Sequence, residues 1–319
     1  MATPALRALR RYYPDATITA TGRGGCCAVL AGLASVDRWV PLPDRPRFWQ
    51  SFALARDFGT DKPDLAVIFP NSPRATWLAW LSGASYRIGF ARGGRGILLN
   101  KALPRFRAGG NRVPRYTALE YLAIVEALGA VSDNDGLDLA VEEDERVAVR
   151  AYLDPRRPVV GFAPGAAFGP SKRWLPERFA AVADRLHEEC DAQCVLMTGP
   201  GEEETRDAVL AAANSPLIQC HEGNPSIERL KATIAEVDVL VGNDSGPRHI
   251  AIAFDKPVIC IMGSTSPLLT DSPWERGEVI RIDVDCGPCQ KPDCVTNHRC
   301  MTGVTVDRVV EATKAHLVE

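Results

Sequence analysis

The sequence has no apolar run long enough to cross a membrane. The longest uncharged apolar-rich stretch near its start, residues 26–36, falls short of the ~20 residues that a spanning helix needs. Residues 1–15 contain neither an apolar signal core nor a cleavage site. The chain also lacks internal repeats and low-complexity segments. With 46% hydrophobic and 24% charged residues, it is not disordered or fibrous. We therefore expect a soluble, cytoplasmic protein of about two domains.

Lysine is scarce, and the charges are unevenly distributed. Only 7 of the 37 basic residues are lysines. Residues 1–116 hold 18 basic against 6 acidic residues, a net charge of +12, whereas residues 117–319 hold 19 against 34, a net charge of -15. A basic first half indicates an anionic partner, which leaves nucleic acid, a phosphorylated glycan or an anionic membrane surface, or else a merely arginine-rich composition. We expect no nucleic acid, because no reader motif is present.

Strand-like and helix-like segments alternate along the chain, which predicts α/β architecture with parallel sheets. In the first half we expect strands at 16–21, 38–42 and 64–69, helices at 48–58, 75–82 and 117–128, and a loop or short hairpin over 91–116. In the second half we expect strands at 159–163, 193–198, 237–241 and 258–262, and helices at 175–188, 202–212, 227–234, 247–253 and 305–316. An acidic run at 142–145 and the breaker at 154–158 place the boundary near residue 150.

The strongest motif is the segment 241–249, VGNDSGPRH, where an apolar strand ends and a helix begins. Backbone N–H groups at such a helix start, together with Ser245 and Gly246, suit a diphosphate. Arg248 and His249 would add donors, and Asp244 or Ser245 would cap the helix. The alternative interpretation is an ordinary capped turn.

Two further segments carry comparable features. The segment 164–174, PGAAFGPSKRW, also joins a strand to a helix, and Lys172 can direct a compact charge at a phosphate. This loop is neither a Walker loop nor a dinucleotide fingerprint, because both glycine spacings are absent. In the segment 226–228, Ser226 caps a helix and Glu228 lies in its first turn. A carboxylate there either simply favours the helix dipole or binds two ribose hydroxyls.

Taken together and in this order, the motifs resemble glycosyltransferase family 9, the ADP-heptose:lipopolysaccharide heptosyltransferases, and most nearly their heptosyltransferase II branch. The resembling segments are PGAAFGPSKRW (164–174), the Ser-x-Glu helix (226–228), NDSGPRHIA (243–251) with GSTSP (263–267), CGPCQKPDC–HRCM (286–301) and PALRALRRYYPDA (4–16). The resemblance implies the GT-B fold, with two Rossmann-like domains facing across a cleft. It places the acceptor domain at 1–150, the nucleotide-sugar domain at 151–304, and a helix at 305–319 that packs back towards the first domain.

The resemblance also implies roles for individual residues. Lys172 would contact the donor diphosphate, while Asp244, Ser245 and Gly246 would hold the phosphates and the sugar. Glu228 would bind the ribose, and His249 would line the same pocket. The basic domain would take the anionic lipopolysaccharide core, with Arg105, Arg107 and Arg112 as candidate contacts, and would touch the cytoplasmic face of the inner membrane. The nucleotide-sugar is a substrate, and no cofactor is expected.

The start of the chain departs from the family pattern. Family members begin with a short apolar strand ending in Gly-Asp, and that Asp is their proposed general base. Because this sequence begins at Met1, just after that place, we expect the catalytic Asp to precede Met1 and the sequence to be a fragment or to start at an internal methionine. The alternative is a chain without the base. A missing strand would leave strands 16–21 and 64–69 without direct pairing.

Four of the ten cysteines gather near the end of the chain, with spacing C-x2-C-x4-C-x5-C. Cys286, Cys289, Cys294 and Cys300, with His298 among them, are plausible zinc ligands by type and separation. The paired C-x2-C pattern of a zinc ribbon is not met, and the family resemblance requires no metal. We therefore expect reduced thiols or an adventitious disulfide, and keep a structural metal as the alternative.

The leading hypothesis is an inverting glycosyltransferase that moves heptose from ADP-heptose to the lipopolysaccharide inner core. One alternative is a family 9 transferase with another sugar or acceptor, since no residue we can name fixes the sugar. The other is a non-catalytic protein that binds a nucleotide-sugar, because the general base is absent from the sequence.

Overall fold

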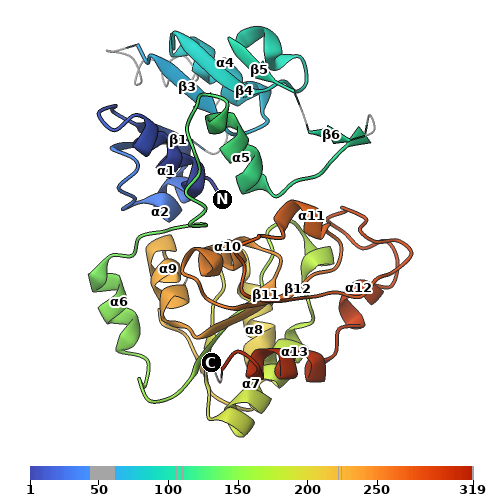
Figure 1. Cartoon of the computed structure of the whole chain (residues 1–319). Helices are drawn as coiled ribbons and strands as arrows, with labels where there is room; N and C mark the ends of the chain where they lie inside the picture. The colour runs from blue at the N-terminus through green and yellow to red at the C-terminus, as the bar shows by residue number, and fades with distance from the viewer. Residues whose placement is uncertain (44–61, 105, 109–110, 222, 224, 318–319) are drawn as a thin grey trace. The chain divides into compact units, whose positions relative to one another are not determined.

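The computed structural model describes residues 1–319 except 44–61, 105, 109–110, 222, 224 and 318–319. The chain divides into two compact units, Met1–Gly136 and Leu137–Glu319. They run from blue to green and from green to red in Figure 1. Within the described part of the chain, no helix combines the length and apolar character that a membrane span requires.

Unit 1, Met1–Gly136, alternates short strands with helices. Its helices are α1 (Thr3–Tyr12), α2 (Gly24–Leu30), α4 (Pro73–Leu81), η1 (Arg95–Leu98) and α5 (Thr117–Glu126). Its strands are β1 (Thr19–Arg23), β2 (Arg38–Leu42), β3 (Leu65–Ile68), β4 (Tyr86–Phe90), β5 (Lys101–Leu103), β6 (Arg107–Ala108) and β7 (Asn111–Arg112). The expected hairpin within 91–116 is confirmed by the antiparallel pair β6–β7. The helix expected at 48–58 lies outside the described residues.

The parallel strands of unit 1 form two separate sheets. One contains β1 and β2, and the other has the order β3-β4-β5. Among the residues that the structure describes, β1 and β3 share no pairing, as the sequence analysis expected of strands 16–21 and 64–69. Helices α1 and α5 pack against each other. Helix α5 also covers β4, where Ile124 joins Ile88 and Phe90 in a buried cluster.

Unit 2, Leu137–Glu319, is larger and more regular. Its helices are α6 (Glu143–Arg150), η2 (Pro170–Lys172), α7 (Pro176–Cys190), α8 (Glu203–Ala212), α9 (Ile227–Glu236), α10 (Gly246–Ala253), α11 (Pro267–Thr270), α12 (Arg299–Thr302) and α13 (Val306–Lys314). Its strands are β8 (Val159–Ala163), β9 (Gln193–Leu196), β10 (Leu217–Ile218), β11 (Val239–Asn243), β12 (Val258–Ile261) and β13 (Gly277–Ile280).

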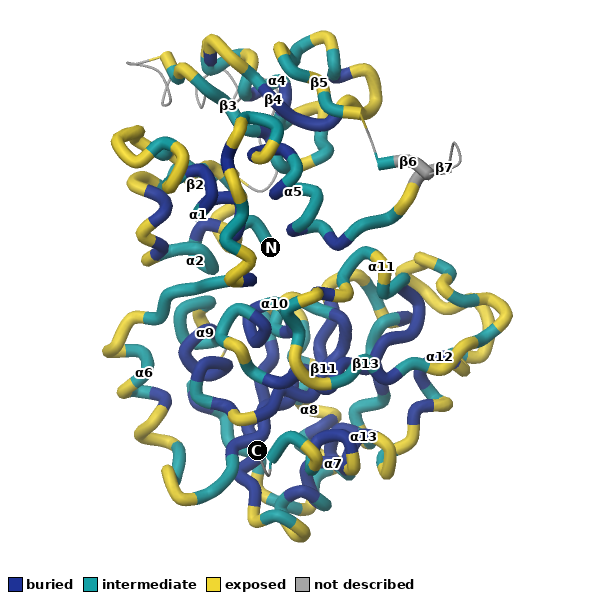
Figure 2. The backbone as a smooth tube through the Cα atoms, in the orientation of Figure 1, coloured by how far each residue is buried: buried dark blue, intermediate teal, exposed yellow. Residues whose placement is uncertain are grey.

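All the strands of unit 2 pair in parallel in one sheet, of order β10-β9-β8-β11-β12-β13. This is the order of a doubly wound nucleotide-binding fold, in which the direction of strand addition across the sheet reverses between the first and fourth strands. Strands β8, β9, β11 and β12 are buried at every position, which appears as the dark blue centre of this unit in Figure 2. Because crossover helices cover both faces, these strands are continuous apolar runs. The predicted α/β class is confirmed.

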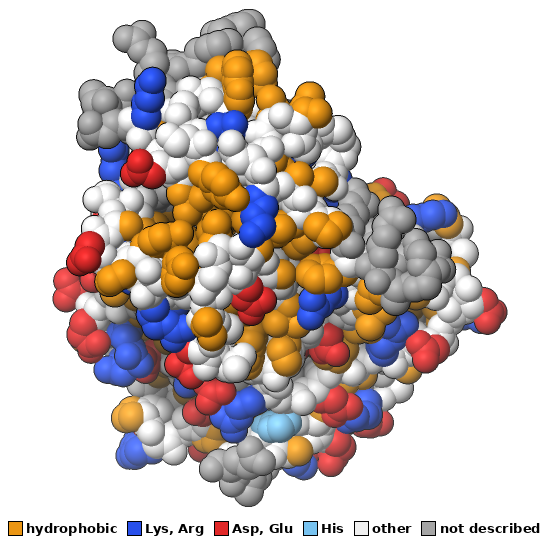
Figure 3. Space-filling model, turned by 45° about the horizontal axis from the view of Figure 1, so that its top comes forward, with side chains coloured by type: hydrophobic (Ala, Val, Ile, Leu, Met, Phe, Trp, Pro, Cys, Tyr) orange, Lys and Arg blue, Asp and Glu red, His pale blue; other side chains and the backbone are white. Residues whose placement is uncertain are grey.

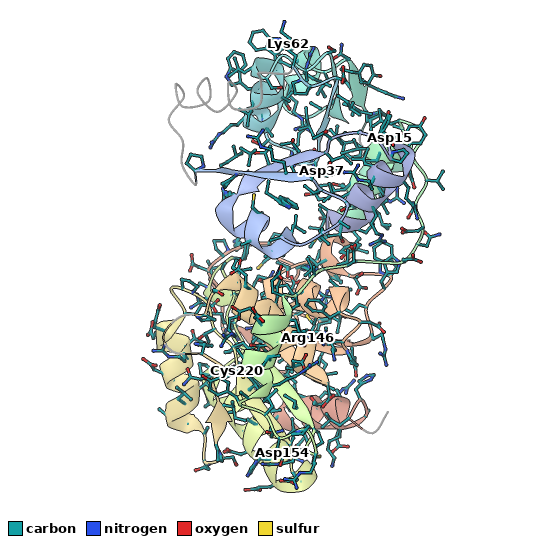
Figure 4. All side chains as sticks on the ribbon, turned by 90° about the vertical axis from the view of Figure 1, so that its left-hand side faces the viewer. Asp15, Asp37, Lys62, Arg146, Asp154 and Cys220 are labelled. Atoms are coloured by element: carbon teal, nitrogen blue, oxygen red, sulfur yellow. The ribbon has the colours of Figure 1, made fainter. Side chains whose placement is uncertain are left out.

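The boundary between the units lies at residues 136 and 137, earlier than the expected residue 150. The acidic run that suggested a linker instead opens helix α6, which packs on α9. Arg146 and Arg150 of α6 both bind Glu236, with N–O distances of 2.8 and 2.7 Å. Figure 4 shows Arg146 on this helix. Helix α13, expected to pack towards the first domain, lies on α7, β12 and β13 of its own unit.

Some elements were not anticipated from the sequence. The expected set lacked strands β4, β5, β10 and β13 and helices α2, α6, α11 and α12, and β1 lies later than the expected 16–21. Strands β10 and β13 are short edge strands whose partners supply the pairing, so the local apolar pattern gives little sign of them. Strand β4 is the central strand of its sheet and was also missed.

Candidate functional site

Three loops of unit 2 meet at the carboxyl ends of adjacent strands. Residues 164–174 follow β8, residues 244–246 follow β11, and residues 263–266 follow β12. The point between β8 and β11 is where the strand order reverses, which is where such sheets bind ligands. The two strongest sequence motifs therefore lie side by side at the position that suits a nucleotide.

Lys172 and Asp244 form the centre of this site. Lys172 Nζ lies 2.7 Å from Asp244 Oδ2, and both side chains are almost fully covered. Thr265 Oγ1 donates to the same Oδ2 at 2.8 Å. Burial acts to raise the pKa of Asp244, but the charge of Lys172 and the hydrogen bonds from Lys172 and Thr265 outweigh it and lower the pKa to about 2. Asp244 is therefore an anion that holds the lysine in place.

A buried arginine anchors the other side of Asp244. Arg248 Nη1 donates to Asp244 Oδ1 at 3.0 Å, and its Nε and Nη2 bind the two oxygens of Glu275 at 2.7 and 2.5 Å. Arg248 is 1% exposed. Burial opposes its charge, but the bond with Glu275 more than compensates and raises its pKa. Arg248 therefore stabilises the motif through its bonds to Asp244 and Glu275. The sequence had suggested instead that it donates to a ligand.

Asn243 and Ser171 tie the loops together. The Asn243 side chain accepts from Trp174 N at 3.0 Å and donates to the Pro164 carbonyl at 2.7 Å, so it clamps both ends of the loop that carries Lys172. The hydroxyls of Ser171 and Ser264 are hydrogen-bonded to each other at 2.9 Å. The 3-10 turn η2 between these contacts carries Lys172 itself. These bonds fix the direction of the lysine.

The start of helix α10 offers backbone N–H groups beside this lysine. Ser245 occupies the N-cap position without a capping bond from its side chain, and its buried hydroxyl has no hydrogen-bond partner among the described residues. The expected cap by Asp244 is also wrong, because its carboxylate is committed to Lys172, Arg248 and Thr265. A Cβ at Gly246 would meet only open space. The helix start is therefore open to an anion.

The remaining predicted donor residues lie nearby but are not joined to the lysine. His249 is half-buried on α10, and burial together with the charge of Arg248 lowers its pKa to about 3, so it is neutral at physiological pH. Ser226 caps α9 as predicted, accepting from Arg229 N at 3.1 Å. Glu228 is half-buried in the first turn of α9, a helix that contacts α10.

The predicted acceptor contacts belong to unit 1. Arg105 lies outside the described residues. Arg107 and Arg112 are register partners in the antiparallel β6–β7 pair. Their role in acceptor binding stays a prediction.

The cysteine segment, residues 286–300, packs against the lysine loop. Ser171 N donates to the Pro292 carbonyl at 3.0 Å, and Gln290 N donates to the Ser264 carbonyl at 2.9 Å. All four cysteines of the segment are free thiols. Among the described residues, no group of three His, Cys, Asp or Glu side chains is arranged to hold a metal ion. The cysteine segment, which the structure describes in full, therefore packs against the loop that carries Lys172 and contributes no side chain to the Lys172–Asp244 pair.

Several functional residues escaped the sequence analysis. Asn243 and Thr265 lie inside resembling segments, but nothing in their local pattern announces the clamp or the bond to Asp244. Glu275 lies far from any motif. The one signal for Glu275 in the sequence is indirect, because a buried arginine requires an acidic partner. That requirement does not identify which carboxylate pairs with Arg248.

Comparison with known proteins shows the family of this chain. The family described as "Glycosyltransferase family 9 (heptosyltransferase)" matches residues 51–299. Lipopolysaccharide heptosyltransferase 2 of Salmonella typhimurium is 29% identical over 325 residues, covering 98% of this chain and 93% of that protein. Lipooligosaccharide heptosyltransferase 2 of Campylobacter jejuni is also 29% identical, over 319 residues and the same shares of both chains.

Solved structures match over nearly the whole chain. The structure of ADP-heptose lipopolysaccharide heptosyltransferase II from Escherichia coli gives a TM-score of 0.83 at 25% identity, covering 99% of this chain and 94% of that one. A glycosyl transferase family 9 protein from Veillonella parvula gives a TM-score of 0.85 at 23% identity, covering 99% and 92%. At that identity the second likeness concerns the fold alone.

Proposed function

Because this chain belongs to glycosyltransferase family 9, we propose that it transfers a heptose from ADP-heptose to the inner core of a lipopolysaccharide. It is a glycosyltransferase with the GT-B fold that the sequence predicted. The observation that carries the proposal is the pair formed by Lys172 and Asp244 at the reversal point of the unit 2 sheet, beside the open start of α10.

In this proposal the donor lies along the carboxyl edge of the unit 2 sheet. Lys172 Nζ, the Ser245 hydroxyl and the N–H groups at the start of α10 hold the diphosphate. Asp244 holds the lysine in the direction of the diphosphate. Glu228, at the start of α9, takes the ribose hydroxyls, and neutral His249 lines the pocket without adding charge.

The reaction replaces one bond at the anomeric carbon by another. The acceptor hydroxyl attacks that carbon with inversion, the bond to the diphosphate oxygen breaks, and ADP leaves with its added negative charge. Lys172 and the helix start stabilise that charge, so they act where it develops. The proton of the acceptor hydroxyl passes to a general base, which we do not assign among the described residues. No cofactor enters this scheme.

The acceptor side falls to unit 1, whose sequence is basic. We infer that its arginines meet the phosphates and acidic sugars of the core. They would also bring the protein into peripheral contact with the cytoplasmic face of the inner membrane. Trp80 and Ile97, on the contacting elements α4 and η1, are 44% and 91% exposed. In Figure 3, hydrophobic side chains gather on the upper part of the visible face with cationic ones among them.

The test is a transfer assay with purified lipopolysaccharide core acceptor and a panel of donors. We expect ADP-heptose to be used with a kcat/KM well above those for ADP-glucose and UDP-glucose. The variant Glu228→Gln should raise the KM for ADP-heptose and leave kcat nearly unchanged, since the ribose lies away from the reacting bond. Efficient transfer of another sugar would replace heptose in the proposal, and donor binding without any transfer would favour the non-catalytic alternative.

A further inference from the structure

Two exposed thiols of the cysteine segment meet at one hydroxyl. Thr296 Oγ1 lies 3.9 Å from Cys286 Sγ and 3.5 Å from Cys294 Sγ, and both cysteines are exposed and free. Cys300 differs from them, because it is buried in the main core of unit 2. The two cysteines therefore share one hydroxyl contact and are both accessible to small reagents, which favours thiol chemistry.

The sulfur of Cys294 is surrounded by hydrogen-bond donors. The Thr296 hydroxyl, the Thr296 N–H and the His298 N–H all bond to its sulfur and lower the pKa of the thiol below its ordinary value. A thiolate accepts hydrogen bonds and donates none, so the Thr296 hydroxyl is the donor whenever Cys294 is ionised. The thiolate is the nucleophilic form of cysteine.

A short chain of contacts joins Cys294 to the donor site. His298, whose N–H bonds to the Cys294 sulfur, places its Nε2 at 3.1 Å from the Ser171 carbonyl oxygen. Ser171 is 2% exposed and immediately precedes Lys172. The same serine binds the segment twice more, through Lys291 O at 2.5 Å and Pro292 O at 3.0 Å. A Cβ at Gly169 would lie 2.4 Å from Pro292 O, so the loop and the segment are in close contact.

We propose that Cys286 and Cys294 form a thiol oxidation site for peroxides, coupled to the donor site through His298 and Ser171. The Cys294 thiolate attacks the peroxide O–O bond, which gives a sulfenic acid and releases water from hydrogen peroxide. The Cys286 thiol then displaces a second water, so two thiols and one peroxide become one disulfide and two waters. The sulfur of Cys294 thereby loses its bonds from Thr296 and His298, and the His298 contact that positions Lys172 shifts.

The experiment compares the reduced and the peroxide-treated full chain. Intact mass should fall by about 2 Da, the mass of two hydrogens lost in a disulfide, and peptide mapping without reductant should find Cys286 joined to Cys294. The Kd for ADP should rise about fivefold on oxidation, as expected for the loss of roughly one hydrogen bond at Lys172, and return on reduction. Cys286→Ser and Cys294→Ser should each bind ADP normally and resist peroxide.

Matched variants separate the site from general oxidation. Cys26→Ser removes an exposed thiol of unit 1 and should leave the peroxide response intact. His298→Ala should weaken ADP binding in the reduced protein, and oxidation of this variant should not weaken binding further. If the disulfide acted only locally, the variant would not show this pattern.

Four outcomes would overturn the inference. They are a disulfide mapped elsewhere, such as between Cys286 and Cys289; a Cys286–Cys294 disulfide that leaves ADP binding unchanged; a peroxide response that survives Cys294→Ser; and one equivalent of bound zinc or iron that protects both thiols. The coupling of the thiols to ADP binding rests on the proposed function, and the experiment distinguishes failure of the coupling from failure of the function. A reduced protein that binds neither ADP nor ADP-heptose contradicts the function, whereas normal binding untouched by oxidation contradicts the coupling.

Discussion

The strands of the two units differ in burial. In unit 2, β8 and β11 are buried at every position and pair with each other inside one continuous sheet. In unit 1, β1 alternates between exposed and half-buried positions, and β3 reaches full burial only at Ile68. The smaller sheets leave more strand surface uncovered. A parallel strand is stabilised by cover on both faces, so unit 2 gains far more from apolar burial.

Polar contacts compensate for part of this difference in unit 1. Asp133 forms ion pairs with Arg7 and Arg11, with N–O distances of 2.8 and 2.7 Å. These pairs join α1 to the end of the unit. Asp37, labelled in Figure 4, accepts from Ile18 N at 2.6 Å and from Arg10 at 2.5 Å beside the pair β1–β2. Unit 2 also has ion pairs that join elements, such as those of Arg146 and Arg150 with Glu236. It differs from unit 1 in the buried pairs of Asp244 with Lys172 and Arg248, which orient Lys172.

The largest expected effect breaks the buried network of unit 2. Arg248→Met leaves Glu275 buried without its partner and should lower the free energy of unfolding by about 3–5 kcal/mol. Asp133→Asn in unit 1 should lower it by less, since its partners Arg7 and Arg11 are 21% and 49% exposed and stay hydrated. Urea unfolding followed by circular dichroism measures both, and an equal loss in the two variants would contradict the comparison.

The next prediction concerns activity without loss of fold. Lys172→Ala should lower kcat for heptose transfer by about 10²–10³-fold, because one preorganised donor to the leaving diphosphate is lost. Thr265 and Arg248 still hold Asp244, so the fold should remain. Lys256→Ala, a lysine of the same unit after α10, is the matched control and should retain activity. Unchanged transfer by Lys172→Ala would refute the assignment of the donor site.

A smaller effect separates the units by pH. The side-chain bond from Arg7 is the main cause that lowers the pKa of Asp133 to about 2. A carboxyl whose pKa is lower in the folded state stabilises the fold above its unfolded pKa and loses that contribution as pH falls from about 4 to about 2. Hydrogen exchange should therefore show unit 1 amides opening over this range. Asp133→Asn should flatten that dependence in unit 1 and leave the dependence of unit 2, to which Asp244 contributes, unchanged.

The smallest expected effect is none at all. If Lys172 and the start of α10 supply the positive charge for the diphosphate, transfer should be the same in EDTA as in Mg²⁺. The initial rate with ADP-heptose, measured after exhaustive chelation, checks this expectation. A rate that falls in EDTA and returns with a divalent cation would show that unit 2 does not stabilise the leaving group alone.

Prediction from sequence succeeded where a local pattern is strong. The apolar runs of β8 and β12 and the capped start of α9 at Ser226 were expected at nearly their observed positions. Edge strands such as β10 and β13 were missed, because their pairing comes from a neighbour rather than from their own residues. Helix α6 was taken for a linker, since the bonds of Arg146 and Arg150 to Glu236 join residues far apart in the chain.

The sequence by itself determined the family, the alternation of strands and helices, and the motifs from which the donor-binding residues are proposed. Those properties depend on residue types at short spacing, which a linear pattern records. Only the tertiary structure decided that Asp244 holds Lys172, that Arg248 turns away to Glu275, and that Cys294 is linked through His298 to Ser171. The direction of a side chain depends on which buried partner it must satisfy, and that partner comes from a distant strand or loop.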